Sequence, residues 1–279
     1  MVLSSAPHSL SKIYQGQFSS ITKEATSLKL LNWNIERGLQ LAGIEAALES
    51  EKPDICILQE VDLNARRTGN RNVAEELARK FRFNYVFGVE FQELSQGSRE
   101  APAYHGQALL SALPIHSSYV LRFVNQSDFW QPHWYLPSWQ SLQRRLGGRM
   151  ALVVEIEVGG ATLLVYNAHL ESRENEGLRL SQLEEILADT KRHGPAIPLI
   201  IAGDFNTKSH ESPLIKRLKE EGFSNALGNE AAVTTLKGDS LDWIFVRGPI
   251  DFENGRVHHE IVASDHYPLS VSIRSSSSS

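Results

Sequence analysis

The chain has 279 residues, of which 41% are hydrophobic and 22% charged, as is typical of a globular protein with a sizeable core. Its net charge of −5 argues against a protein that binds long nucleic acid by non-specific contacts, although a local basic patch can still bind phosphate. The single cysteine, Cys56, excludes an intramolecular disulfide. We find no secretory signal and no run long enough to span a membrane, so a cytoplasmic location is the default expectation.

We predict one domain over residues 28–274, with a lead-in at 1–27 and a disordered serine tail at 275–279. In its first half, apolar residues spaced three and four apart predict helices over 41–50 and 73–81. Short apolar runs predict strands over 28–33, 54–59, 85–89, 105–111 and 117–123.

The second half continues this pattern. Gly159-Gly160 joins two apolar stretches and predicts a hairpin. A helical stripe lies at 180–187, and Ser212-Pro213 opens a helix to about 221, because proline is favourable in a first turn. The strands predicted here are 150–158, 161–167, 199–202, 240–246, 256–262 and 268–273.

Strands outnumber helices, and many consecutive strands are joined by short turns. This arrangement favours two sheets packed face to face with helices on the outside, in a single domain. It argues against a doubly wound parallel sheet, in which helices would join most strands.

Polar side chains recur at the ends of these strands. The apolar run 199–202 continues through Gly203 into Asp204 and Asn206, which share one face of an extended chain while Phe205 points away. A turn explains one such ending equally well. The pattern recurs, however, at Asn34, Glu60, Asn167 with His169, Asp242, and Asp265 with His266.

If these strand ends converge, Glu60, Asp204 and Asp265 bring like charges together, and such groups resist joint ionisation. A divalent cation removes this conflict, and a set rich in oxygen atoms favours Mg²⁺ or Mn²⁺ over zinc. Adjacent side chains of an extended chain point to opposite faces. We therefore expect His266 to pair with Asp242 rather than with Asp265, because a carboxylate partner fixes the tautomer of an imidazole.

These motifs resemble the endonuclease/exonuclease/phosphatase superfamily, the metal-dependent phosphoesterases related to deoxyribonuclease I and exonuclease III. The resemblance runs in family order from about residue 28 to 273 and is specific as an ordered set. Its pieces are Asn32-Trp-Asn-Ile35, Leu58-Gln-Glu-Val61, Asn167-Ala-His-Leu170, Gly203-Asp-Phe-Asn206, Leu241-Asp-Trp-Ile-Phe245 and Ser264-Asp-His-Tyr-Pro268.

The resemblance implies a four-layer α/β/β/α sandwich of two packed mixed sheets with outer helices. It implies Mg²⁺-dependent hydrolysis of a phosphodiester, with Mn²⁺ as an alternative ion. Glu60 resembles the main metal ligand, with Asn34 beside it and Asp265 as a second metal-side carboxylate.

The resemblance also implies catalytic roles. Asp204 and Asn206 resemble the pair that aligns the attacking water. His266, held by Asp242, resembles the catalytic histidine, and His169 a second histidine that contacts the phosphate. Whether His266 or Asp204 takes the proton of the water stays open at this stage.

Three further residues are candidates for substrate binding: Asn167, Gln107 and Arg149. Gln107 stands where many members of the family carry Asn, which changes the reach of the amide more than its chemistry. Several arginines can flank a phosphate site, and for each the alternative is a solvated surface charge. They are Arg66, Arg67, Arg144, Arg145 and Arg149.

The substrate stays open between nucleic acid and a small-molecule or lipid phosphodiester. The aromatic segment 125–145 can stack on bases, enter a membrane interface or pack over the sandwich. Its aromatic residues are Phe129, Trp130, Trp134, Tyr135 and Trp139. A phosphomonoesterase and a non-catalytic binding member of the same fold are the alternative functions. We expect a monomer without an obligate protein partner.

Overall fold

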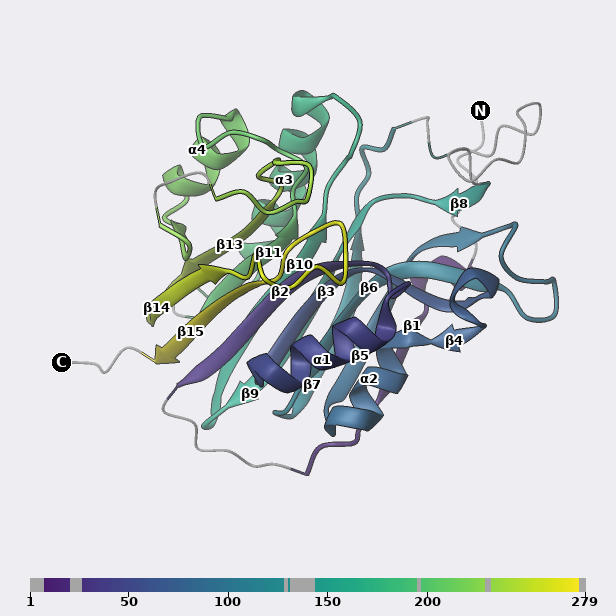
Figure 1. Ribbon diagram of the computed structural model, residues 1–279. Helices are drawn as coiled ribbons and strands as arrows, with labels where there is room; N and C mark the ends of the chain where they lie inside the picture. The colour runs from purple at the N-terminus through teal and green to yellow at the C-terminus, as the bar shows by residue number, and fades with distance from the viewer. Residues whose placement is uncertain are drawn as a thin grey trace.

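The computed structural model describes residues 8–20, 27–127, 130, 144–194, 197–228 and 232–275. Two β-sheets stack face to face, and helices cover the outer face of each sheet (Figure 1). This is the predicted four-layer α/β/β/α sandwich, and the prediction is confirmed.

The first sheet has the strand order β1-β5-β6-β3-β2-β15-β14, with β4 beside β3 and β8 beside β5. Within it β2 and β3 are parallel, and the other strand pairs are antiparallel. Its strands are β1 (Ile13–Gly16), β2 (Leu28–Arg37), β3 (Ile55–Ala65), β4 (Arg71–Asn72), β5 (Asn84–Glu93), β6 (Ala103–Ser111), β8 (Arg145–Gly147), β14 (Ile250–Val257) and β15 (Leu269–Ser275).

The second sheet has the order β12-β13-β11-β10-β9-β7. Here β10 and β11 are the parallel pair, and the others are antiparallel. Its strands are β7 (Ile115–Arg122), β9 (Met150–Val158), β10 (Ala161–His169), β11 (Leu199–Asp204), β12 (Ser224–Asn225) and β13 (Asp242–Arg247). The predicted hairpin of β9 and β10 is present.

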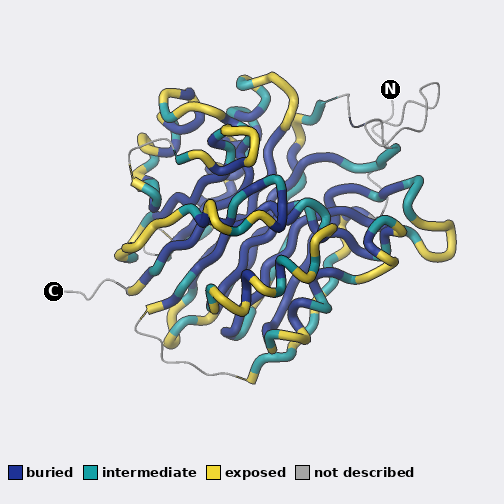
Figure 2. Tube along the Cα trace, viewed as in Figure 1, coloured by how far each residue is buried: buried dark blue, intermediate teal, exposed yellow. Residues whose placement is uncertain are grey.

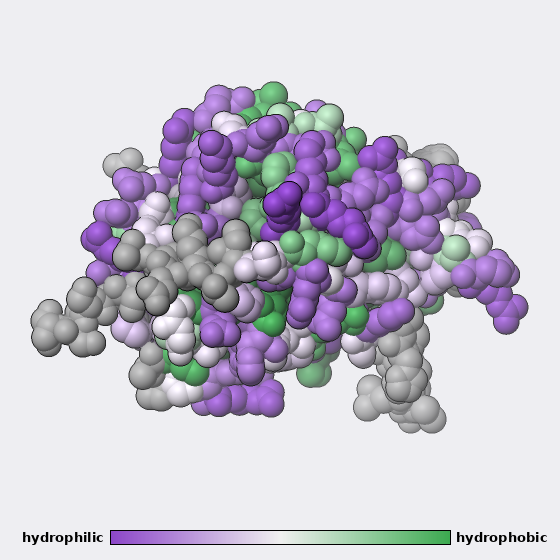
Figure 3. Space-filling model, turned by 90° about the horizontal axis from the view of Figure 1, so that it is seen from below, coloured by the Kyte–Doolittle hydropathy of each residue, from purple (hydrophilic) through white to green (hydrophobic). Residues whose placement is uncertain are grey.

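Four α-helices and two short 3₁₀ helices complete the described part of the chain. The first sheet carries α1 (Leu41–Glu51) and α2 (Val73–Phe81), and the second carries α3 (Glu176–Thr190) and α4 (Pro213–Glu220). The 3₁₀ helices are η1 (His8–Ser11) and η2 (Arg66–Thr68). None of the helices described is both long enough and apolar enough to cross a membrane. From below the view of Figure 1, the surface is mostly hydrophilic, with apolar residues in separate patches (Figure 3).

The central strands are largely apolar because both of their faces are covered. On β2, Leu30 packs between the two sheets while Leu31 packs under the helices. On β11, Ile200 lies between the sheets while Ile201 faces α3 and α4. The buried strands therefore form the centre of the molecule (Figure 2), and a run with no polar alternation is the expected sequence.

Two boundaries differ from the predicted elements. The strand predicted at 256–262 is wrong, because β14 covers Ile250–Val257 and the chain then turns. This edge strand is largely exposed, so it lacks the apolar signal on which the prediction depended. Residues 13–16, within the predicted lead-in, form β1 and pair with β5. Of the predicted serine tail, residues 276–279 lie outside the described residues.

Candidate active site

The polar strand ends meet at one edge of the sandwich. Because β2 and β3 are parallel, and β10 and β11 likewise, their C-terminal ends reach this edge together. His169 and Asp204 are paired in register on β10 and β11. Asn34 at the end of β2 donates from Nδ2 to Oδ2 of Asp204 at 3.2 Å, which joins the two sheets.

Asp204 is at the centre of this arrangement. Its Oδ2 lies 3.7 Å from Nε2 of His169 and 3.8 Å from Nε2 of His266. Its Oδ1 accepts a hydrogen bond from the backbone N–H of Asn206 at 3.0 Å, and the side chain of Asn206 donates to the carbonyl of Leu170. Two imidazoles thus face one oxygen of a carboxylate whose other oxygen is held by the backbone.

His266 and Asp242 form the predicted pair, with 2.7 Å between Nδ1 and Oδ2. Burial by itself would lower the pKa of His266, but the carboxylates of Asp242 and Asp204 raise it to about 10. Burial also raises the pKa of Asp242. Both shifts mean that the pair holds a proton tightly, and the proton resides on the imidazole because it is the stronger base. The two carboxylates therefore favour the imidazolium form of His266.

Glu60 lies at a bulge in the middle of β3, in an unusual backbone conformation. Its φ of 51° is in the left-handed region, and the pairing of β3 with β6 shifts register between Leu58 and Val61. The neighbouring β2 has a matching irregularity, in which Glu36 and Arg37 have φ values of 45° and 68°. Such bulges re-aim side chains, and strained backbone of this kind clusters at functional sites.

The charge around Glu60 favours its ionised form. Burial would raise the pKa of Glu60, but Arg37 and the imidazoles of His105 and His169 hold it well below its ordinary value. The pKa of Glu36 is raised by burial and by the carboxylates of Asp265 and Glu60. The expected convergence of acidic groups is therefore present on this side of the site.

This donor set fits Mg²⁺ or Mn²⁺. Glu60 supplies an ionised carboxylate, Asn34 an amide oxygen, and Asp265 a carboxylate whose charge reaches Glu36. Hard divalent cations prefer oxygen ligands of this kind. Among the described residues, Asp204, Asp242 and His266 also form an acid–histidine group whose possible ligand atoms all lie within 4.8 Å of one another.

A family model described as the Endonuclease/Exonuclease/phosphatase family matches residues 31–266. The chain belongs to this family. Its members are generally hydrolases that act on phosphoesters, and they are typically dependent on a divalent metal. No curated protein matches the sequence.

Solved structures of the family share the fold. The human Nocturnin catalytic domain with a bound sulfate anion has a TM-score of 0.70 and 17% identity, covering 97% of this chain and 100% of that one. An endonuclease/exonuclease/phosphatase from Beutenbergia cavernae has a TM-score of 0.64 and 19% identity, over 90% and 72% of the two chains. Humanized D. rerio TDP2 has a TM-score of 0.60 and 19% identity, over 90% and 100%.

The predicted substrate-binding residues Asn167, Gln107 and Arg149 are buried and bonded within the protein. Asn167 crosses between the sheets, donating from Nδ2 to the carbonyls of Leu58 and Ala108. Gln107 donates to the carbonyl of Met150 at 2.9 Å. Because these amide groups already donate to backbone carbonyls, a direct contact of Asn167 or Gln107 with substrate stays a prediction.

Arg149 is 3% exposed, and its Nη1 lies 2.6 Å from Oε1 of Glu90. The other oxygen of Glu90 lies 3.6 Å from Nδ1 of His169. Burial would raise the pKa of Glu90, but Arg149 and His169 lower it to about 2. Glu90 thus places a negative charge near His169, at a longer distance than the 2.7 Å hydrogen bond between Asp242 and His266. Sequence reasoning missed Glu90, whose only signal is a charge inside the buried strand β5.

The aromatic segment is described only in part. Trp130 is buried, its ring centroid is 5.0 Å from that of Phe91, and the guanidinium carbon of Arg149 lies 4.6 Å from its centroid. Its indole N–H donates to Glu171. Trp130 therefore packs over the sandwich. Phe129, Trp134, Tyr135 and Trp139 lie outside the described residues.

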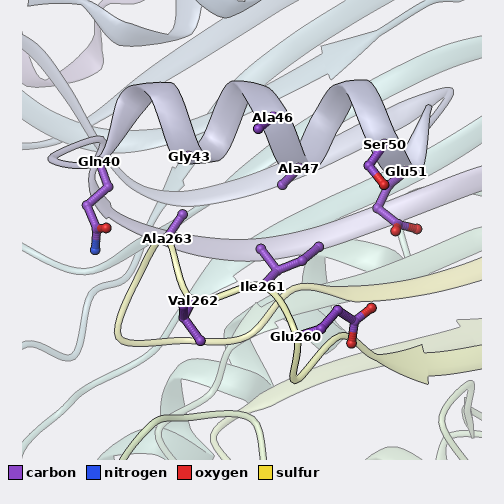
Figure 4. A pocket seen from close by; sticks show the side chains of 10 residues that line it. All are labelled: Gln40, Gly43, Ala46, Ala47, Ser50, Glu51, Glu260, Ile261, Val262 and Ala263. Atoms are coloured by element: carbon purple, nitrogen blue, oxygen red, sulfur yellow. The ribbon is translucent and has the colours of Figure 1, made fainter.

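A groove of about 420 Å³ lies between α1 and the loop 260–263 (Figure 4). It adjoins a second acid–histidine group of Glu51, His258 and Glu260. Lys29 pairs with Glu51 at 2.6 Å and Arg256 with Glu260 at 2.7 Å. The negative charges of Glu51 and Glu260 are therefore already paired with a lysine and an arginine. This distinguishes them from the converging acids of the candidate active site.

Proposed function

We propose that this chain is a Mg²⁺-dependent phosphodiesterase that hydrolyses its substrate by water attack. The observation that supports this most directly is the convergence on Asp204. One of its oxygens faces Asn34 at 3.2 Å, His169 at 3.7 Å and His266 at 3.8 Å. These groups come from four different strand ends or turns, so the sequence reaches this geometry only through the tertiary fold.

Glu60, with Asn34 and Asp265 beside it, would hold the metal ion. When bound, Mg²⁺, or Mn²⁺ in its place, supplies positive charge to the phosphate oxygens and eases departure of the leaving group. The low pKa of Glu60 fits this role, because an ionised carboxylate binds a cation without first losing a proton.

The remaining groups act on the water and the phosphate. In this proposal His266 is protonated at neutral pH, so it donates to a phosphate oxygen rather than accepting a proton. Asp204 is then the acceptor for the proton of the attacking water, and Asn206 orients that water. His169 offers its Nε2, which lies 3.7 Å from Oδ2 of Asp204, as a second phosphate contact.

The test is hydrolysis of bis-p-nitrophenyl phosphate by the full chain in the presence of Mg²⁺. We expect activity that EDTA removes and that Glu60→Ala and His266→Ala each abolish. Glu76→Ala and His116→Ala, which change exposed residues away from the site, are the matched controls and should retain activity. Undiminished hydrolysis in either site variant would contradict these roles.

Parallel assays separate the alternatives. Faster release from p-nitrophenyl phosphate than from the diester would indicate a phosphomonoesterase. Metal binding without turnover of any phosphoester would indicate a non-catalytic member of the family. A panel of abasic DNA, single-stranded DNA, RNA, sphingomyelin and inositol phosphates would identify the substrate class.

A further inference from the structure

The arginines around the candidate active site differ in how firmly a protein carboxylate holds them. Arg149 lies 2.6 Å from Glu90, and Nε of Arg67 lies 2.6 Å from Asp62. Such close pairs neutralise the charge of the guanidinium, although Nε of Arg149, like that of Arg37, is buried without a hydrogen-bond partner in the described part of the chain. Arg67 and Arg149 are both candidates from the sequence, but in the structure each forms a close ion pair with a carboxylate of the protein.

Arg37 is held differently. Its Nη1 is 3.6 Å from Oε2 of Glu60, which is beyond hydrogen-bond distance. Its Nε is buried and has no hydrogen-bond partner within the described part of the chain. Its side chain is 24% exposed, so the guanidinium reaches the surface of the site. An unsatisfied charged donor in this position is costly unless a ligand completes its bonding.

The backbone directs Arg37 toward this place. It has a φ of 68°, follows Glu36 with a φ of 45°, and lies at the bulge where β2 loses register with β3. Glu60, on the facing bulge, has a φ of 51°. These three left-handed conformations, two of them consecutive on β2 and one on β3, are costly, and they bring the guanidinium to the predicted metal ligand.

A cation held by Glu60 would repel Arg37 unless an anion lay between them. A planar guanidinium with five donors suits a phosphate group, which can accept two parallel hydrogen bonds from it. We propose that Arg37 is a phosphate-binding residue of this site, which exchanges its long contact with Glu60 for the phosphate of the substrate. This proposal rests on the proposed function and adds a residue that the family motifs do not include.

The test measures binding rather than turnover. Inorganic phosphate is titrated by calorimetry into the Mg²⁺-loaded full chain, for the wild type, Arg37→Gln, Arg37→Lys and Arg256→Gln. We expect Arg37→Gln to weaken phosphate binding about tenfold or more, since it removes charge-assisted hydrogen bonds. Arg37→Lys keeps the positive charge but not the two parallel donors of the guanidinium, so it should lose less phosphate affinity. Arg256, an exposed arginine on the edge strand β14, is the control.

A second titration with Mg²⁺ alone distinguishes phosphate binding from support of Glu60. Without phosphate, Arg37→Gln should bind Mg²⁺ at least as tightly as the wild type, because a repelling charge has been removed. Loss of Mg²⁺ binding in this variant would overturn the proposal, as would wild-type phosphate affinity in Arg37→Gln or no phosphate binding by the wild type. If Arg37→Gln does not fold, unchanged phosphate affinity in Arg37→Lys would overturn it equally.

These titrations need no hydrolysis. A wild type that binds phosphate through Arg37 but turns over no phosphoester would contradict the proposed function alone. A wild type that hydrolyses bis-p-nitrophenyl phosphate, with Arg37→Gln unchanged in phosphate affinity, would contradict the role of Arg37 alone.

Discussion

Asp242 and His266 are separated by 24 residues in the sequence, yet Oδ2 of Asp242 lies 2.7 Å from Nδ1 of His266. Trp33 holds the backbone of His266 from the other sheet, because its indole N–H donates to the carbonyl of His266 at 2.8 Å. The imidazole is thus fixed at both its ring and its backbone. Its Nε2 is the remaining polar atom of the ring, and it faces Asp204.

The first prediction is that Asp242→Asn lowers the pKa of His266, because the ring loses the charge that stabilises its imidazolium form. Loss of a positioned acid should reduce kcat by about 10²–10⁴-fold. The ring pKa is measured by NMR titration and kcat with bis-p-nitrophenyl phosphate. Asp239→Asn, at a half-buried surface carboxylate paired with Lys208, is the control. An unchanged ring pKa in Asp242→Asn would contradict the pairing.

The second prediction concerns stability and pH. The pKa of His266 rises from 6.5 to about 10 on folding, so the folded state binds this proton more tightly. The resulting stabilisation is complete below about pH 6.5 and is lost as the pH rises through 10, with a slope of up to about 1.4 kcal/mol per pH unit. Urea unfolding between pH 6 and 10 measures it. His266→Gln should flatten this dependence, whereas His116→Gln should not.

The third prediction concerns the metal. Mg²⁺ should raise the melting temperature of the wild type, because a ligand that binds only the folded state stabilises it, by about 2.7 kcal/mol at a concentration of 100 times Kd. Glu60→Gln should remove most of this shift, since it deletes the ionised carboxylate. Glu76→Gln should keep it. The melting temperatures are measured by scanning fluorimetry. An equal Mg²⁺-induced shift in Glu60→Gln and in the wild type would show that the ion binds elsewhere.

The fourth prediction is that Glu90→Gln destabilises the fold by about 3–5 kcal/mol, because it leaves Arg149 as an unpaired charge that is 3% exposed. The free energy of unfolding in urea measures this loss. Glu253→Gln removes a half-exposed carboxylate from β14 and should change stability by less than about 1 kcal/mol. A similar small effect in Glu90→Gln would show that Arg149 finds another partner.

The fifth prediction concerns Gly203, which precedes Asp204. A Cβ at this position would lie 1.9 Å from the carbonyl oxygen of Ala168, and the φ of 142° is strained for any other residue. Gly203→Ala should therefore destabilise the protein by more than about 3 kcal/mol or prevent folding. Gly177→Ala, in the open first turn of α3, should be neutral or stabilising. Equal stability of the two variants, judged by thermal unfolding, would contradict the close approach.

The sequence alone predicted most of the fold and most residues of the candidate site. Its uniform apolar runs predicted strands buried on both faces, and β2, β3, β10 and β11 are such strands. Polar residues at their ends predicted one convergent site, because strand ends in a stacked pair of sheets share an edge. The pairing of His266 with Asp242 followed from the alternation of side chains in an extended chain. The bounds of the exposed strand β14 were not predicted correctly, because this strand has little apolar periodicity.

Only the tertiary structure decided which charged residues face the candidate site and which are paired in the protein interior. Arg149 is a candidate phosphate ligand from the sequence and Arg37 is not, but in the structure Arg149 is buried against Glu90 while Arg37 reaches Glu60. Local sequence does not encode that difference. It arises because the register of β2 and β3 creates facing bulges, and because burial makes a charge depend on partners that are distant along the chain.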